Sequence, residues 1–176
     1  MTARAALKAA TREAHDRVDA AFAAHDLGER ASYGDFLRRH AAALAPLEQS
    51  LDAAGARDLI EAWDEHRRAP LLAADLAQLG LTAPPSITAP AFASDARIAG
   101  GLYVLEGSRL GGAVLRRSVP PAFPVAFLSA AQSPGRWTHF IASLDQLLYN
   151  RRQLDTAIAA ALESFALFER AAKDCE

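Results

Sequence analysis

The sequence is poor in cysteine and in surplus charge, and each shortage excludes a class of protein. Cys175 is the single cysteine among 176 residues, so a disulfide within the chain and a multi-cysteine zinc or iron–sulfur site are both excluded. Lysine and arginine number 19 against 21 acidic residues, which gives a net charge of −2. This balance argues against a basic face for binding nucleic acid, and we expect no nucleic-acid partner.

Long hydrophobic segments are also lacking. No run of about 18 apolar residues is present, so we expect no membrane span. The first residues lack the apolar core of a secretory signal, and the polar C-terminal residues argue against a tail anchor. Together with the low cysteine content, these features predict a cytoplasmic protein.

Alanine is abundant and runs of β-branched residues are nearly absent, which favours helices. Apolar side chains at spacings of three and four predict a first helix from Thr2 to about Ala24. A second helix should follow Ser32 as its N-cap, with Asp35 completing a capping box, and should end at Gly55. Further helices are expected over 56–68, 70–79, 94–118 and 136–173, with a loop over 81–94 and a break near 149–150. No repeat or linker divides the chain, so the pattern predicts a single all-α domain over residues 1–176.

One segment of the first helix could carry chemistry. His15 lies four residues after Thr11 and four before Asp19, so all three share a helix face. A neutral imidazole can bind iron through one ring nitrogen while Asp19 accepts a hydrogen bond from the other. Lys8 and Arg12 lie on an adjacent face, where they could meet carboxylates of a ligand held by His15. Taken alone, this pattern is more typical of an ordinary amphipathic helix with a histidine at its solvent edge.

Five of the ten glycines in the chain fall within residues 100–112, in an otherwise helical segment. Each glycine inside a helix costs about 1 kcal/mol relative to alanine, so some contact or function has to offset several kcal/mol. Gly107 and Gly111 are four residues apart and share one face, which would let a flat body touch the helix backbone and let the helix bend. Close packing against another helix explains the glycines equally well from spacing alone.

A histidine on one helix and a glycine-lined face on another could sandwich a planar macrocycle with an axial ligand. At these residues the sequence resembles the haem oxygenases, especially the bacterial branch associated with phytochromes. The matching motifs are Leu-Lys-x-Ala-Thr-x-x-x-His at 7–15 and Tyr-Val-Leu-Glu-Gly-Ser-x-Leu-Gly-Gly at 103–112, and Phe-x-x-Phe-Glu at 165–169 also fits.

The resemblance implies an all-α haem oxygenase-like fold in which one haem b lies between a proximal helix and a kinked distal helix. It also implies that His15 is the proximal iron ligand and that the distal glycines lie against the haem face. The expected haem site comprises His15 as the metal ligand, Lys8, Arg12, Asp19, Gly107, Gly111 and Gly112 as haem-binding groups, and Gly107, Ser108 and Gly111 as the groups that act in catalysis.

One position departs from the animal members of the family, which place an aspartate directly after the first distal glycine to order water above the iron. Ser108 occupies that place here. A serine hydroxyl can hydrogen-bond to water but carries no charge, so Ser108, Arg109 and another helix remain alternatives for this role. The further candidates for contacts to haem from late in the chain are Arg136, His139, Tyr149, Arg151 and Arg152.

The implied activity is O2-dependent opening of the haem ring to biliverdin, ferrous iron and carbon monoxide, with haem as both cofactor and substrate. Electrons would come from an external donor such as a ferredoxin or a reductase, because no flavin or nicotinamide fingerprint is present. A bacteriophytochrome could accept the biliverdin. Two alternatives remain: a haem-binding carrier or sensor with the same fold that does not degrade haem, and a helical domain without a cofactor whose glycines only pack helices.

The remaining histidines show no metal-ligand spacing. His40 lies on the apolar stripe of the second helix and is expected in or near the core. His25 and His66 stand among polar residues and are expected to face solvent. The aromatic residues expected in the core are Trp63, Trp137, Phe140, Phe165 and Phe168, of which Trp137 and Phe140 could border a haem pocket.

Overall fold

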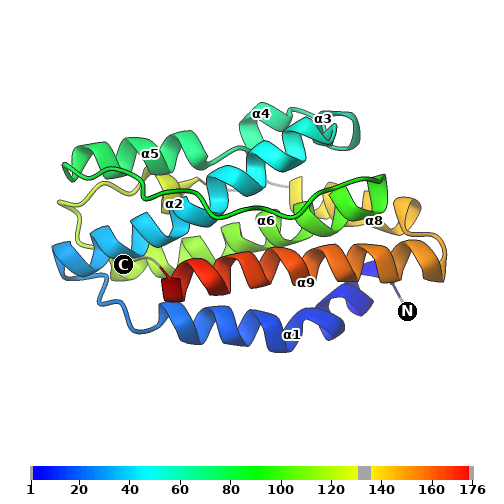
Figure 1. Ribbon diagram of the computed structural model, residues 1–176, viewed down its shortest axis with the longest axis horizontal. Helices are drawn as coiled ribbons and strands as arrows, with labels where there is room; N and C mark the ends of the chain where they lie inside the picture. The colour runs from blue at the N-terminus through cyan, green and yellow to red at the C-terminus, as the bar shows by residue number, and fades with distance from the viewer. Residues whose placement is uncertain (1, 131–135, 175–176) are drawn as a thin grey trace.

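The computed structural model describes residues 2–130 and 136–174, and its regular elements are helices (Figure 1). In chain order they are α1 (Ala3–Phe22), α2 (Arg30–Ala53), α3 (Ala56–Leu59), α4 (Trp63–His66), α5 (Ala69–Gln78), α6 (Asp95–Leu115), the 3-10 helix η1 (Arg116–Ser118), α7 (Ala126–Ser129), α8 (Arg136–Leu147) and α9 (Arg151–Asp174). Because the described ranges contain no β-strand, the predicted all-α fold class is confirmed. No helix in these ranges is long and apolar enough to cross a membrane.

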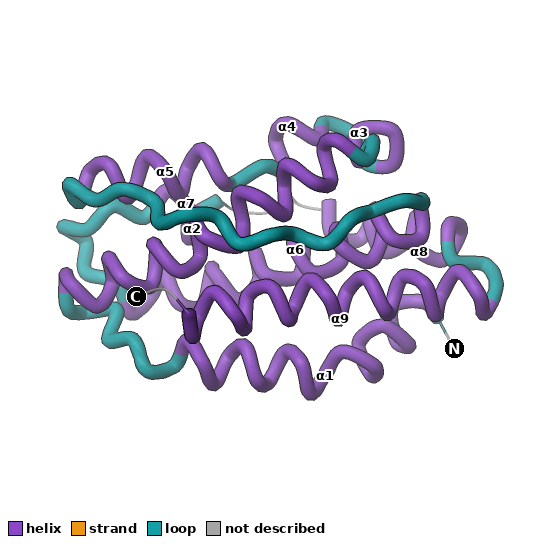
Figure 2. The backbone as a smooth tube through the Cα atoms, viewed as in Figure 1, coloured by secondary structure: helices purple, strands orange, loops and turns teal. Residues whose placement is uncertain are grey.

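The long helices α1, α2, α6 and α9 form the body of the molecule and run along its longest axis (Figure 1). Helix α9 packs against α1, α2 and α6, while α5 covers α2 and α7 lies against α5 and α6. The loop over 81–93 crosses the bundle between α5 and α6, as the extended teal segment in Figure 2 shows. It is fixed to α2 by a hydrogen bond from Ile87 N to Ala42 O at 3.1 Å and by one from Ser50 Oγ to Pro90 O at 2.7 Å.

Helix ends follow the local sequence signals in most places. Thr2 and Ser94 accept hydrogen bonds from backbone amides three residues on, and so cap α1 and α6. Gly55 and Gly80, with φ of 94° and 74°, take up the left-handed conformation after α2 and α5. The expected loop over 81–94 and the expected break between the last two helices are both confirmed.

The predicted N-cap of α2 is wrong. Glu29 takes that role, because its carboxylate accepts hydrogen bonds from the amides of Ala31 and Ser32 at 3.0 and 2.7 Å. These two bonds lower the pKa of Glu29 below its ordinary value. Asp35, which was expected to complete a capping box, points instead to the side chains of His25 and Arg39.

The single helix predicted over 56–68 is also wrong. The chain forms two short helices there, α3 and α4, because Ile60 is extended and Ala62 has a left-handed φ of 54°. Trp63 begins α4 and is buried, and its Nε1 donates to Asp52 Oδ1 at 2.9 Å. The break therefore lets an aromatic side chain turn into the core.

Helix α7 is capped by a carboxylate from another helix. Asp75 on α5 is fully buried, and its two oxygens accept the amide hydrogens of Ala126 at 3.0 Å and Phe127 at 2.9 Å. A helix of four residues makes few hydrogen bonds of its own, so this contact fixes where α7 begins.

Replacing Asp75 with alanine is expected to lower the free energy of unfolding by about 1–3 kcal/mol, because one buried and one part-buried amide lose their acceptor. The melting temperature should fall by about 3–10 °C, which far-UV circular dichroism would measure. The matched control is Asp155→Ala, which removes an exposed carboxylate that pairs with Arg151 at 2.8 Å. Equal shifts for the two variants would contradict the role assigned to Asp75.

Candidate functional site

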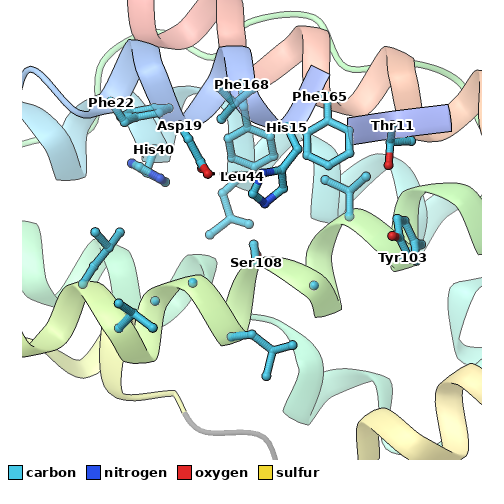
Figure 3. Close-up of a pocket in the computed structure, with 18 of the residues that line it drawn as sticks. Thr11, His15, Asp19, Phe22, His40, Leu44, Tyr103, Ser108, Phe165 and Phe168 are labelled. Carbon is cyan, nitrogen blue, oxygen red and sulfur yellow. Dashed lines mark ion pairs between the residues drawn. The ribbon is translucent and has the colours of Figure 1, made fainter. Parts of the chain in front are cut away.

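A cavity of about 660 Å³ lies between α1 and α6, and the rest of its wall comes from α2, α7, α9 and Arg68, just before α5. Its lining is mostly apolar, and its size lies in the range typical of small-molecule sites. Both segments that the sequence singled out border it, since His15 stands on one wall and Ser108 on the other (Figure 3). The fold therefore brings together two motifs that are far apart in the chain.

His15 projects from α1 toward α6 (Figure 3). Its Nδ1 lies 3.2 Å from Asp19 Oδ2, and the ring of Phe165 stands edge-on to it with centroids 5.8 Å apart. At this distance Asp19 is placed to accept a proton from Nδ1, which would leave the Nε2 lone pair for a metal. Asp19 thus lies where the sequence predicted an orienting acceptor. No group of three or more histidine, cysteine or acidic side chains in the described ranges could hold a metal ion, so His15 would be a lone protein ligand.

The glycines of α6 divide into two groups with different surroundings. A Cβ at Gly100 would overlap the carbonyl oxygen of Ala157 on α9, and Gly101 is enclosed by side chains in a similar way. A Cβ at Gly107 or Gly111 would meet no atom within 4 Å, because both positions face the cavity. Helix packing therefore explains the first pair, whereas the second pair leaves bare backbone on the cavity wall.

Gly112 combines the two situations. It borders the cavity, but a Cβ there would lie 3.6 Å from the carbonyl oxygen of Leu128 on α7. This is an ordinary van der Waals distance, so the packing of α7 does not require glycine at this position. Helix α6 continues through all five glycines without interruption.

Ser108 points across the cavity toward His15, and its hydroxyl contacts a buried guanidinium that no sequence pattern predicted (Figure 3). Arg68 stands just before α5, is 3 % exposed, and donates through Nη2 to Ser108 Oγ and to Leu105 O at 3.0 Å. Burial, followed by repulsion from Arg109, lowers the pKa of Arg68 to about 10, so it stays charged at neutral pH. A residue outside α6 thus supplies the charge that Ser108 lacks.

Arg109, another of the alternatives for the distal polar group, does not line the cavity. Its guanidinium bonds with Glu106, with His66 O and with Ala130 O on the opposite side of α6. Of the three alternatives, Ser108 and a residue from another segment border the cavity.

The prediction that His25 and His66 face solvent is wrong. The side chain of His25 is 10 % exposed and lies 3.0 Å from Asp35, while His66 is 3 % exposed and lies 2.9 Å from Glu106. Polar neighbours in the sequence suggested a surface position for both residues. Each histidine is instead paired with a carboxylate: His25 with Asp35 on the next helix, α2, and His66 with Glu106 on the distant α6.

His40 lies near the core, as predicted, and also lines one end of the cavity (Figure 3). Its Nδ1 lies 2.9 Å from Phe36 O, and its ring centroid lies 4.1 Å from that of Phe22. Burial lowers the pKa of His40 to about 4, so the ring is neutral at physiological pH. Phe165 and Phe168 are buried, as expected, and they line the cavity too.

Basic residues stand along one rim of the cavity. Lys8 and Arg12 are exposed there, as the sequence predicted, and Arg4 joins them from one turn earlier in α1. The spacing of four between Arg4 and Lys8 could have revealed this third residue. Of the candidates from late in the chain, five do not line the cavity. Phe140 is buried elsewhere, and the exposed ones, on or between α8 and α9, are His139, Tyr149, Arg151 and Arg152. The side chains of Arg136 and Trp137 lie outside the described residues.

Known proteins resemble this chain in sequence and in structure. A heme oxygenase from Xanthomonas campestris pv. campestris (strain 8004) is 36 % identical over 143 residues, covering 78 % of this chain and 86 % of the relative. No family model matches. The heme oxygenase of Neisseria meningitidis, solved with NO and CO bound, superposes with a TM-score of 0.81 at 24 % identity, over 99 % of this chain and 92 % of that one.

A second solved structure, the heme oxygenase from Leptospira interrogans, superposes with a TM-score of 0.76 at 18 % identity and covers 99 % of this chain and all of its own. At these identities the two structures show a shared fold. The sequence similarity to the Xanthomonas protein goes further, because it extends over most of both chains. The chain belongs to the haem oxygenase family.

Proposed function

We propose that this chain binds one haem b in the cavity between α1 and α6 and opens the ring to biliverdin, ferrous iron and carbon monoxide. The observation that carries the proposal is that His15 faces bare backbone at Gly107 and Gly111 across a mostly apolar cavity. Membership of the haem oxygenase family supports the same reaction. The haem, as cofactor and substrate, would supply both the iron that binds O2 and the ring carbon that is oxidised.

The residues present fit a flat iron porphyrin. His15 can ligate the metal on one face, and the open space where Gly107 and Gly111 lack a Cβ can receive the other face. Lys8 and Arg12 at the rim, together with Arg4, can pair with the propionate carboxylates. The apolar ring edge would then lie toward the aromatic side chains at the far end.

Each neighbouring group has a role in this arrangement. Asp19 lies 3.2 Å from His15 Nδ1, where it can favour the tautomer that leaves Nε2 for the metal. With haem in the cavity, the bare backbone of α6 would lie beside the open face of the ring and would confine a small molecule bound there. The Ser108 hydroxyl donates to Leu105 O at 2.7 Å and accepts from Arg68, so it could accept one further hydrogen bond from water in that space. The charge of Arg68 behind it would stabilise negative charge that develops nearby.

The reaction needs partners that this chain does not contain. Electrons would come from an external ferredoxin or reductase, in line with the missing flavin and nicotinamide fingerprints. A bacteriophytochrome would take up the biliverdin, and the cytoplasm would be the site of action. A carrier or sensor would use the same cavity, but it would return the haem unchanged.

A haemin titration followed by reductant in air tests the proposal directly. The wild-type protein should give a Soret band with histidine ligation, and ascorbate or a ferredoxin system should convert it to the spectrum of biliverdin. A Soret band that persists under these conditions would favour the carrier or sensor, and no spectral change on adding haemin would remove the haem site altogether.

Replacing His15 with alanine is expected to abolish the normal axial ligation, because the described cavity wall places no other imidazole opposite Ser108. Asp19→Ala should keep the ligand but weaken haem binding about tenfold, since it loses only the carboxylate beside Nδ1 of His15. The control is His139→Ala, an exposed histidine away from the cavity. An unchanged Soret band and ligation in the His15 variant would exclude this residue from the site.

Replacing Gly107 or Gly111 with leucine is expected to block ring opening while haem still binds. The side chain would fill the space above the ring, and the rate should fall by about tenfold or more, which corresponds to about 1.4 kcal/mol in the barrier. Single-turnover spectroscopy of the haemin-loaded variants would measure this rate. Normal turnover by either variant would show that the steric account is wrong.

A further inference from the structure

The side of α6 that faces away from the cavity is held by a buried polar cluster of Glu106, Arg109 and His66. These residues are 1 %, 4 % and 3 % exposed. His66 Nδ1 lies 2.9 Å from Glu106 Oε1, and Arg109 Nε donates to the same oxygen at 3.1 Å. Because a carboxylate accepts only, His66 carries its proton on Nδ1.

Arg109 connects α6 to two other parts of the chain. Its Nη1 donates to Ala130 O, just after α7, at 3.2 Å, and its Nη2 donates to His66 O at the end of α4. One guanidinium thus fastens α6 to both neighbouring segments. Burial alone would raise the pKa of Glu106, but the hydrogen bond from His66 and the charge of Arg109 outweigh it and lower the pKa. The carboxylate is therefore ionised at neutral pH and pairs with a charged partner.

On the cavity side of the same stretch, Arg68 donates to Leu105 O and to Ser108 Oγ, but the glycine positions themselves have no packing contact. A Cβ at Gly107 or Gly111 would meet no described atom within 4 Å, so packing from the front does not fix the backbone there. Glycine also has the greatest backbone freedom of any residue. The position of this stretch is consequently set by polar contacts of the residues that flank Gly107. Arg68 bonds to it on the cavity side, and the cluster of Glu106, Arg109 and His66 holds it from behind.

Stability alone explains the cluster poorly. A buried ion pair often contributes little net stability, because removing two charges from water costs about as much as their attraction returns. Its geometry is directional, however, and directional bonds from Arg109 to two other segments define a position. Apolar side chains in the same place would fill space without setting the height of the helix.

We propose that Glu106, with Arg109 and His66, is a positioning group for ring opening. The cluster holds the backbone from Gly107 to Gly111, and with it the Ser108 hydroxyl, at a fixed height above the haem. This inference rests on the proposed function, since the height matters only if a ring lies beneath the helix. Glu106 acts through the helix and does not touch the substrate.

Glu106→Gln tests the proposal, with Glu163→Gln as its matched control. Both variants remove a carboxylate that pairs with an arginine of α6, but Glu163 pairs with Arg97 at the start of that helix and is 46 % exposed. In the haem-free protein, amide hydrogen exchange over residues 105–112 should be about tenfold faster in Glu106→Gln, because one charge-assisted hydrogen bond is weakened. Exchange over 157–168 of α9 should not change, and Glu163→Gln should match the wild type in both segments.

A second readout follows the environment above the ring. In the ferric haemin-loaded protein, the optical spectrum is recorded against pH, because it responds to the hydrogen-bonding groups on the distal side. Glu106→Gln should shift the midpoint of this titration, and Glu163→Gln should not. Arg109→Lys keeps the positive charge but loses the planar set of guanidinium donors, so it should give the same results as Glu106→Gln. If Glu106→Gln does not fold, Arg109→Lys is used in its place.

Exchange that accelerates equally in α6 and α9 would mean a general loss of stability and would overturn the proposal. Unchanged exchange with an unchanged pH titration would overturn it as well. Ring opening by the wild type is measured alongside. A wild type that leaves haem intact counts against the proposed function, whereas an active wild type with an unaffected Glu106→Gln variant counts only against the positioning role.

Discussion

The contact of α9 with α1 and α6 determines whether a cavity exists at all. Along α9, Ala157, Ala160 and Ala161 are completely buried, and the first of these lies so close to α6 that only glycine fits at position 100. Two turns later the small side chains give way to Phe165 and Phe168, which line the cavity. Small residues bring helices together and large residues keep them apart, so the change from alanine to phenylalanine along one helix creates the space that His15 enters.

Helix α6 uses the same residue type for two opposite purposes. Near its start, glycine removes a side chain so that a neighbouring helix can approach. Near its end, glycine removes a side chain so that no protein atom approaches. The energetic cost of glycine in a helix is offset by close packing in the first case. In the second case no packing contact at the glycine positions offsets it, because a Cβ there would meet no atom within 4 Å.

Features that depend on local spacing could be predicted from the sequence. The four-residue interval between His15 and Asp19 placed both on one helix face, and the same interval did so for Gly107 and Gly111. The position of Arg68 in the cavity wall could not be predicted, because it depends on how a segment 40 residues before Ser108 packs against α6. The burial of His66 could not be predicted either, because its carboxylate partner, Glu106, lies far away in the sequence on α6. The polar residues next to His66 in the sequence suggested instead that it is exposed. The absence of His139 from the site depends on the rotation of α8 about its axis, which tertiary packing decides.

The open space beside Gly107 and Gly111 has a consequence for engineering. Alanine would fit at both positions without a clash and would favour the helix by about 1 kcal/mol at each. A directed-evolution campaign that selects only for heat resistance of the empty protein would therefore enrich these substitutions. If haem binds as proposed, the added methyl groups would lie in the space meant for the ring, and a screen run without haem would not detect this cost.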